Sequence, residues 1–325
     1  MVLSASSAHR SPSLPKPRGP LSEALASALV RARTGSAWPD QGGPDDAALS
    51  LWILYELSYR GYAEVDDRLE LDPGLVGLRR SLEDELEQRR LRARWPGPPA
   101  YEGGFAEAFF AMVAADDGPS LARFVQREAT ADQVVELVQH GSLYRLKEAD
   151  PFTFALPRLP APARAALAEL QYDEYGGGRP DRMHAHLYAA GMAALGLDAG
   201  EGGYVDEAPL EVLEQNNAMS LFGLTRRLRG ACVGHLAAFE ATSSLPCRQI
   251  AQGMERLGMP AEMRAYYEEH VEADAVHEQL AVRMVCEPLI AAEPDTEDDV
   301  WFGAWTCLDL EARLARRLLA TWDAA

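Results

Sequence analysis

Apolar residues recur at helical spacing along most of the chain. The segment DDAALSLWILYELSYRGY begins with acidic residues suited to a helix N-terminus and continues from about Asp45 as an apolar helical run. After it, the same spacing predicts helices over residues 73–93, 104–115, 120–127, 131–140, 160–175, 180–195, 206–228, 230–241, 245–257, 260–289 and 298–322. Strand signals are weak throughout. The pattern therefore predicts an all-α fold, with a single helical bundle formed by residues 45–325.

Residues 1–44 differ from the rest of the chain in composition. They are rich in Ser, Pro, Gly and Ala, and only Leu21–Arg33 has the pattern of a short helix. Such a composition buries too little apolar surface to offset the entropy lost on ordering. We expect a disordered, flexible N-terminal arm over residues 1–44 that the domain at residues 45–325 does not need for its stability.

The overall charge and the cysteines limit where the protein works and what it binds. The 325 residues carry a net charge of −19, which disfavours nucleic acid and anionic membrane surfaces. No apolar run reaches membrane-spanning length, and the N-terminus lacks the apolar core of a secretory signal. The four cysteines show no CxxC spacing, which argues against a zinc site or a disulfide framework. We therefore expect a cytoplasmic protein.

The run EEHVEADAVHEQ holds the first candidate for chemistry. His270, Asp274 and His277 lie at positions i, i+4 and i+7, and on a helix their side chains fall within about 60° of one another. Two imidazoles and a carboxylate suit iron or manganese better than a structural zinc, which usually recruits cysteine. The alternative is an exposed acidic helix that carries two histidines by chance.

Two upstream segments supply further ligands of the same kinds. Glu148 lies in SLYRLKEADPFTF, and Glu174 and His184 flank the glycines at 176–178. A glycine break between two helices lets the chain bend, so that both side chains can face one centre. A phosphate-binding loop is excluded there, because no strand precedes the glycines and no GK[ST] follows them. The candidate ligands are enough for two metal ions, as in bundle di-iron proteins: Glu148, Glu174, His184, His270, Asp274 and His277.

Several other polar residues are weaker candidates. His186 is two positions from His184, so a helix turns it away from the same centre. Glu240 lies in the apolar run HLAAFEATS and, if buried, needs a partner, which a metal-bound histidine, His235 or an arginine would provide. Glu56 and Tyr144 are candidates for a pocket wall.

Four longer stretches resemble a known family. They are KEADPFTFALPRL, DEYGGGRPDRMHAHLY, HLAAFEATSSLPCRQIAQGMERLG and YYEEHVEADAVHEQ. From about Leu51 to the C-terminus the chain resembles the heme-oxygenase-like diiron oxidases, also called the iron-containing redox enzyme family. The resemblance places the family's ligands on Glu148, on the pair Glu174 and His184, and on the triplet from His270 to His277. It implies a heme-oxygenase-like bundle with two iron ions, dioxygen as co-substrate, and no catalytic residue beyond the ligands.

The resemblance also limits the reaction. Members carry out N-oxygenation of amines or guanidines, oxidative C–C cleavage, or desaturation. We expect N-oxygenation of a small nitrogen-containing metabolite in natural-product biosynthesis, with C–C cleavage or desaturation of an amino or fatty acid as the alternative. A heme-binding protein and a non-catalytic helical protein are alternatives of other classes. The expected partner is a small-molecule substrate, and an external electron donor and a homodimer stay open.

Overall fold

The structure is a computed structural model that describes residues 12–33 and 37–323, apart from the side chains of residues 272–276. Its α-helices are α1 (Pro20–Val30), α2 (Pro44–Glu56), α3 (Pro73–Glu85), α4 (Phe105–Ala114), α5 (Leu121–Arg127), α6 (Ala131–Arg145), α7 (Asp150–Thr153), α8 (Ala161–Glu174), α9 (His184–Ala194), α10 (Leu210–Leu224), α11 (Arg229–Arg256), α12 (Ala261–Gln279), α13 (Glu287–Ala292) and α14 (Glu297–Asp323). Two π-helices, η2 (Leu86–Arg92) and η8 (Leu280–Cys286), continue α3 and α12. Short 3₁₀ turns are η1 (Asp67–Leu71), η3 (Leu156–Arg158), η4 (Gly176–Gly178), η5 (Pro180–Arg182), η6 (Val205–Glu207), η7 (Arg226–Leu228) and η9 (Pro294–Thr296). No strand occurs in these described ranges, so the all-α prediction is confirmed.

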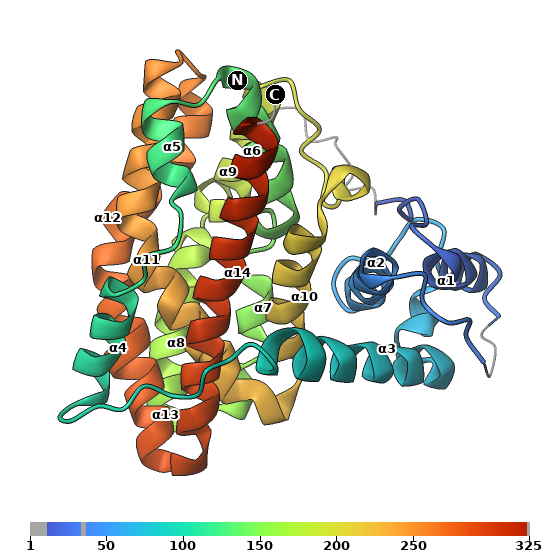
Figure 1. Ribbon diagram of the computed structural model, residues 1–325, viewed down its shortest axis with the longest axis horizontal. Coiled ribbons are helices and arrows are strands. Elements are labelled where there is room, and N and C mark those ends of the chain that lie inside the picture. Colours follow the sequence, from blue (N-terminus) through green and yellow to red (C-terminus); the bar gives the residue numbers. More distant parts are fainter. Residues whose placement is uncertain (1–11, 34–36, 324–325) are drawn as a thin grey trace.

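The long helices form one bundle with a smaller lobe at its side (Figure 1). Helix α11 packs against α14, α12 and α5, and α12 packs in turn against α9. Helices α1, α2 and α3 lie beside the bundle, where α2 packs against α10. This arrangement surrounds α11 with partners on several sides, which agrees with its many buried residues.

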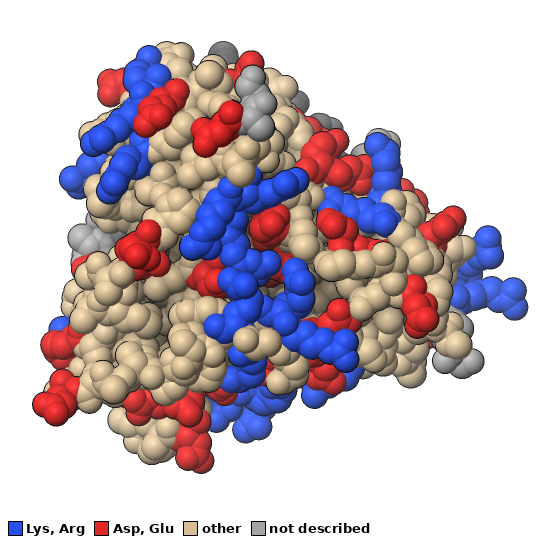
Figure 2. Space-filling view, in the orientation of Figure 1, with Lys and Arg blue, Asp and Glu red and all other residues tan. Residues whose placement is uncertain are grey.

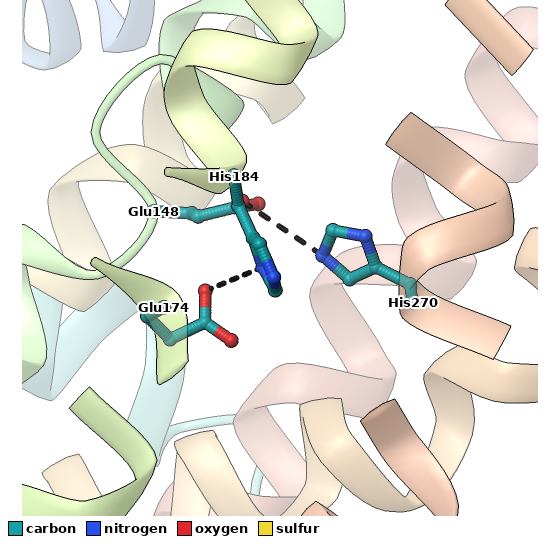
Figure 3. A group of neighbouring side chains, drawn as sticks. All are labelled: Glu148, Glu174, His184 and His270. Atoms are coloured by element: carbon teal, nitrogen blue, oxygen red, sulfur yellow. Dashed lines mark ion pairs between the residues drawn. The ribbon is translucent and has the colours of Figure 1, made fainter. Parts of the chain in front are cut away.

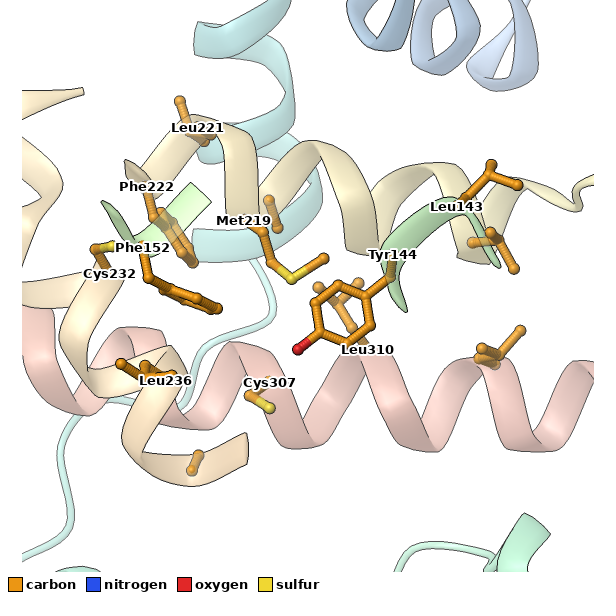
Figure 4. Close-up of a cluster of buried hydrophobic side chains, with 14 of the residues drawn as sticks. Leu143, Tyr144, Phe152, Met219, Leu221, Phe222, Cys232, Leu236, Cys307 and Leu310 are labelled. Atoms are coloured by element: carbon orange, nitrogen blue, oxygen red, sulfur yellow. The ribbon is translucent and has the colours of Figure 1, made fainter. Parts of the chain in front are cut away.

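The core lies between α10, α11 and α14, with side chains from α6 and α7 closing it (Figure 4). Phe152 from α7 and Phe222 from α10 both lie in this core (Figure 4). Both rings also pack against His235, at centroid distances of 6.3 and 5.9 Å. Burial lowers the pKa of His235 to about 4, so it is a neutral core residue. This core holds α6, α7 and α11 in place, and these helices carry or flank the polar side chains of the site.

Glycines lie where helices approach most closely. A Cβ at Gly191 on α9 would lie 2.6 Å from the Cα of Met263 on α12. A Cβ at Gly234 on α11 would overlap the carbonyl oxygen of Val300 on α14. At both crossings the backbones touch each other, so the distance between the helices is set by main-chain atoms.

The predicted helices agree with the structure with a few differences. The expected helices over 230–241 and 245–257 form one helix, α11, which continues through Pro246. Proline removes a backbone N–H and normally breaks a helix, but packing of α11 against α5, α12 and α14 holds both halves in line. The expected helix from residue 180 begins only at His184, after the turn Pro180–Arg182.

The expected flexible arm over residues 1–44 contains a packed helix in its described parts, residues 12–33 and 37–44, and residues 1–11 and 34–36 lie outside the described residues. Helix α1 buries Leu21, Leu25 and Leu29 against the rest of the lobe. Its first backbone N–H groups, from Leu21 and Ser22, donate to the carboxylate of Asp46 at 3.0 and 2.8 Å. Burial alone would raise the pKa of Asp46, but backbone donors lower it, so the carboxylate stays charged and caps the helix. The average composition of residues 1–44 is polar, but three leucines at helical spacing give α1 an apolar face.

Charge is distributed unevenly over the surface. Arginines form a stripe along α14 and η2, on one face of a protein whose net charge is −19 (Figure 2). Arg90 and Arg313 both pair with Glu214, and Arg94 pairs with Asp309, which ties η2 to α10 and α14. As for membranes, every helix in the described part is too short or too polar to cross one.

Candidate metal centre

Four of the predicted ligands meet between α6, α8, α9 and α12. Glu148 lies on the turn after α6, Glu174 ends α8, His184 begins α9, and His270 lies on α12. Each is at most 9 % exposed, and one ligand atom from each lies within 4.8 Å of the others. Figure 3 shows the His184 ring between Glu174 and His270, with Glu148 behind it. Residues separated by more than 120 positions thus point at one centre.

The distances within this group leave room for an ion between the side chains. Nδ1 of His184 lies 2.9 Å from Oε2 of Glu174 and 3.8 Å from Oε1 of Glu148. Nε2 of His270 also lies 3.8 Å from that Glu148 oxygen. The other ring nitrogen of His270, Nδ1, donates to the backbone carbonyl of Tyr266 at 2.8 Å. This bond leaves Nε2 as an unprotonated nitrogen facing the group, which is the tautomer that binds metals.

A second group shares Glu174 with the first. It consists of Glu174, Glu240 and His277, whose ligand atoms also lie within 4.8 Å of one another. Nδ1 of His277 is 3.5 Å from Glu240 and 3.9 Å from the Oε1 oxygen of Glu174. The side chain of Asp274 lies outside the described residues, so its predicted role is untested. Glu240 therefore faces the predicted ligands, and its place on an apolar helix was the signal for a buried carboxylate that needs a partner.

Chain geometry brings Glu174 and His184 together as predicted. Proline residues begin α8, and α8 ends at Glu174. At Gly176 the backbone has φ +73, and a Cβ there would lie 2.6 Å from the backbone nitrogen of Met183. Only glycine fits this turn, which reverses the chain so that His184 begins the next helix beside Glu174.

Burial and neighbouring charges shift the pKa of several of these groups. Burial, and then the charge of Glu174, raise the pKa of Glu148 to about 8. Burial would lower the pKa of His184 and of His277, but adjacent carboxylates raise both to about 9, with Glu174 acting on His184 and Glu240 on His277. The folded protein therefore keeps protons in this centre at neutral pH, where they balance the carboxylates. A bound cation would take the place of those protons.

The donor atoms fit a metal centre. Oε2 of Glu148 accepts from the Tyr266 hydroxyl at 2.5 Å, whereas Oε1 has no hydrogen bond within the part of the chain that is described. The same holds for Nδ1 of His277. Buried polar atoms without partners are costly, and a metal ion would satisfy both. Carboxylate oxygens and imidazole nitrogens without thiolates are the ligands that non-heme iron uses.

A pocket adjoins Glu148 and Glu174. Its walls include Phe152, Leu236 and Phe239, and Tyr144 lies in it as expected. The amide oxygen of Gln171 accepts from Thr153 at 2.8 Å, and its nitrogen Nε2 has no partner among the side chains and backbone described.

Two other candidate residues lie elsewhere. Glu56 was expected at a pocket wall, but it pairs with Lys147 on the other side of the turn that carries Glu148. His186 is exposed and outside both groups, in agreement with the helical-spacing argument.

The fold and the site define an all-helical protein with a buried carboxylate–histidine centre suited to iron. A sequence model of the family described as iron-containing redox enzyme matches residues 135–312, and the chain belongs to that family. It is also similar to nitrosourea synthase from Streptomyces achromogenes subsp. streptozoticus, with 25% identity over 150 residues. That match covers 46% of this chain and only 32% of the relative. A CADD-like protein of unknown function from Nostoc punctiforme shares the fold, with a TM-score of 0.50, 16% identity, and coverage of 65% of this chain and 94% of that one.

Proposed function

We propose that the protein is a non-heme diiron oxygenase that uses dioxygen to oxidise a nitrogen atom of a small metabolite. The observation that carries this proposal is the position of Glu174. Its Oε2 faces His184 at 2.9 Å, and its Oε1 faces His277 at 3.9 Å, so one carboxylate can serve two ions. When bound, two irons supply the electrons that activate dioxygen.

The protein's own residues hold and orient this centre. Glu148, His184 and His270 would hold one ion, Glu240 and His277 the other, with Glu174 between them and Asp274 as a further candidate. The backbone carbonyl of Tyr266 orients the His270 ring, and the hydroxyl of the same tyrosine fixes one oxygen of Glu148. These hydrogen bonds hold the side chains of His270 and Glu148 in the orientation needed to bind a metal before it arrives.

The substrate would bind in the pocket beside Glu148 and Glu174. Its aromatic and aliphatic walls exclude water from the reacting atoms. Because Thr153 holds the amide oxygen of Gln171, the free amide nitrogen can donate to an oxygen or nitrogen acceptor of a substrate. The free space between these walls is about 10 Å³, enough for one water, so a small polar substrate would enter only when side chains of the wall move.

The preference for nitrogen rests on the similarity to nitrosourea synthase, whose name states that its product contains a nitrogen–oxygen bond. Such products are small nitrogen-rich molecules, so we place the enzyme in natural-product biosynthesis. Oxidative C–C cleavage or desaturation would use the same ligands. We also propose a cytoplasmic location, because the spacing of the four cysteines in the sequence shows no disulfide framework.

The proposal includes an external electron donor, because insertion of one oxygen atom from dioxygen consumes two further electrons. The arginine stripe on α14 and η2 suits an acidic carrier such as a ferredoxin (Figure 2). Arg316 and Arg317 are exposed, and within the described ranges neither has an ion-pair partner, unlike Arg313 beside them. Reversing the charge of Arg316 and Arg317 should weaken ferredoxin binding and flatten its salt dependence. Unchanged binding would remove this part of the proposal.

Iron content and oxygen uptake test the function itself. Protein loaded anaerobically with Fe(II) should hold two irons per chain and, in air, consume oxygen with a panel of amines and guanidines. Mass spectrometry should show products heavier by one oxygen. His184→Ala should lower the iron content to about one per chain and abolish uptake, whereas His186→Ala on the same helix should change neither. A single iron per chain in the active protein would contradict the diiron assignment, and a Soret band would favour heme.

A further inference from the structure

The turn that carries Glu148 is tied to the N-terminal lobe by a buried ion pair. Lys147, the residue before Glu148, contacts the carboxylate of Glu56, which is the last residue of α2. Their side chains are only 6 % and 4 % exposed. A buried charge that loses its partner is strongly unfavourable, so this pair fixes where Lys147 lies.

Aromatic side chains of the same lobe enclose the lysine. The ammonium of Lys147 lies 4.4 Å from the ring centroid of Tyr59 and 5.7 Å from that of Trp52. Tyr59 is held in turn by its hydroxyl, which is 3.1 Å from the Ser220 hydroxyl on α10. Cation–π contacts add to the attraction of Glu56. Three side chains from residues 52–59 therefore surround one ammonium group.

Glu148 extends in the other direction. Its Oε1 lies 3.8 Å from both His184 and His270, and its Oε2 accepts from the Tyr266 hydroxyl. Residues 146–149 form a turn between α6 and α7. Backbone bonds from the N–H of Leu146 to Ser142 at 3.3 Å and from the N–H of Asp150 to Lys147 at 3.0 Å shape this turn, and side-chain contacts fix where it lies. After it, Asp150 accepts from the Tyr175 hydroxyl at 2.7 Å. The contacts of Lys147 differ from the others, because they reach the N-terminal lobe, which lies outside residues 135–312, the part of the chain that the family model matches.

We propose that the Glu56–Lys147 pair is a positioning element for Glu148. Through it, the N-terminal lobe sets the metal affinity of the group formed by Glu148, Glu174, His184 and His270. The group of Glu174, Glu240 and His277 contains no residue of this turn and shares only Glu174 with the first group, so its affinity should change far less. The inference needs the metal centre of the proposed function, and it does not need the proposed oxidation.

Cobalt(II) binding to the full chain, measured by calorimetry without oxygen, tests this proposal. The wild-type protein should show two binding events. In Glu56→Gln one event should weaken by about 10- to 100-fold, and the other should stay within about threefold. Glu214→Gln is the matched control, because Glu214 is a buried carboxylate whose pairs with Arg90 and Arg313 lie away from the turn. It should leave both events unchanged.

The double variant Glu56→Gln/Lys147→Met separates positioning from stability. It removes both buried charges, so its thermal midpoint should recover towards that of the wild type. The weakened cobalt event should stay weak if the pair positions Glu148. Recovery of affinity together with the midpoint, equal weakening of both events, or no weakening in Glu56→Gln would each overturn the inference. Absence of cobalt binding in the wild type would instead remove the metal centre, and the inference with it.

Discussion

Substitution of one leucine decides whether the N-terminal segment belongs to the folded protein. Leu25 lies at the middle of α1 and is 0% exposed, between Leu21 and Leu29 on the same face. Leu25→Ala removes a side chain whose transfer from water contributes about 1.5–3 kcal/mol, and it leaves a cavity. Buried leucine-to-alanine changes cost about 2–5 kcal/mol in total, so the free energy of unfolding should fall by that amount.

Urea unfolding followed by circular dichroism measures this change, with Val30→Ala as the matched control on the same helix. Val30 is 58% exposed, so its truncation should alter stability by less than about 0.5 kcal/mol. If Leu25→Ala also stays within about 0.5 kcal/mol of the wild type, α1 does not stabilise the fold, and the argument from its buried face is incorrect. A deletion of residues 1–44 should then be harmless as well.

Four further outcomes follow from the centre and its surroundings. Asp274→Ala should lower iron content and stop oxygen-dependent turnover, and full activity would exclude Asp274 as a ligand. The pKa of His184 is raised to about 9, so its protonation stabilises the metal-free protein fully below pH 6.5, and this stabilisation is lost as the pH rises through 9. Melting curves of the metal-free protein should show this loss. Bound metal should remove the pH dependence. Gly191→Ala should cost about 1–3 kcal/mol in urea unfolding, because its methyl would meet Met263, and a neutral result would mean that the two helices separate easily. Metal removal should raise amide hydrogen exchange over residues 265–285 before the rest of the bundle, and equal exchange with and without iron would show that the helix does not depend on the metal.

Periodic spacing made the bundle and much of the centre predictable. His270 and His277 share a helix face, and their residue types and spacing are visible in the sequence. Glycines mark the turn between Glu174 and His184, which makes this pair visible in the sequence. The structure brings Glu174, His184 and His270 together with Glu148, and it places His277 beside Glu174 and Glu240.

Contacts between distant segments could not be predicted in the same way. Glu240 lies on an apolar helix at no periodic spacing from another ligand, so only its charge indicated a buried role. The pairing of Glu56 with Lys147 spans 91 positions, and nothing local to either residue identifies the other. The packing of α1 was not predicted, because its N-terminal N–H groups are capped by the carboxylate of Asp46 on another helix. Each of these depends on which surfaces meet, and that information is tertiary.

The contact of Gly191 with Met263 has a consequence for how such a centre can change during evolution. These residues lie on the helices that carry His184 and His270, and the Gly191 backbone lies directly against the Cα and side chain of Met263. Exchanging one core side chain for another elsewhere in the bundle cannot bring these two helices closer. The gap between the two histidines is thus inherited with the backbone, and ligand identity can vary while that gap is kept. A wider gap requires only a larger residue in place of one glycine.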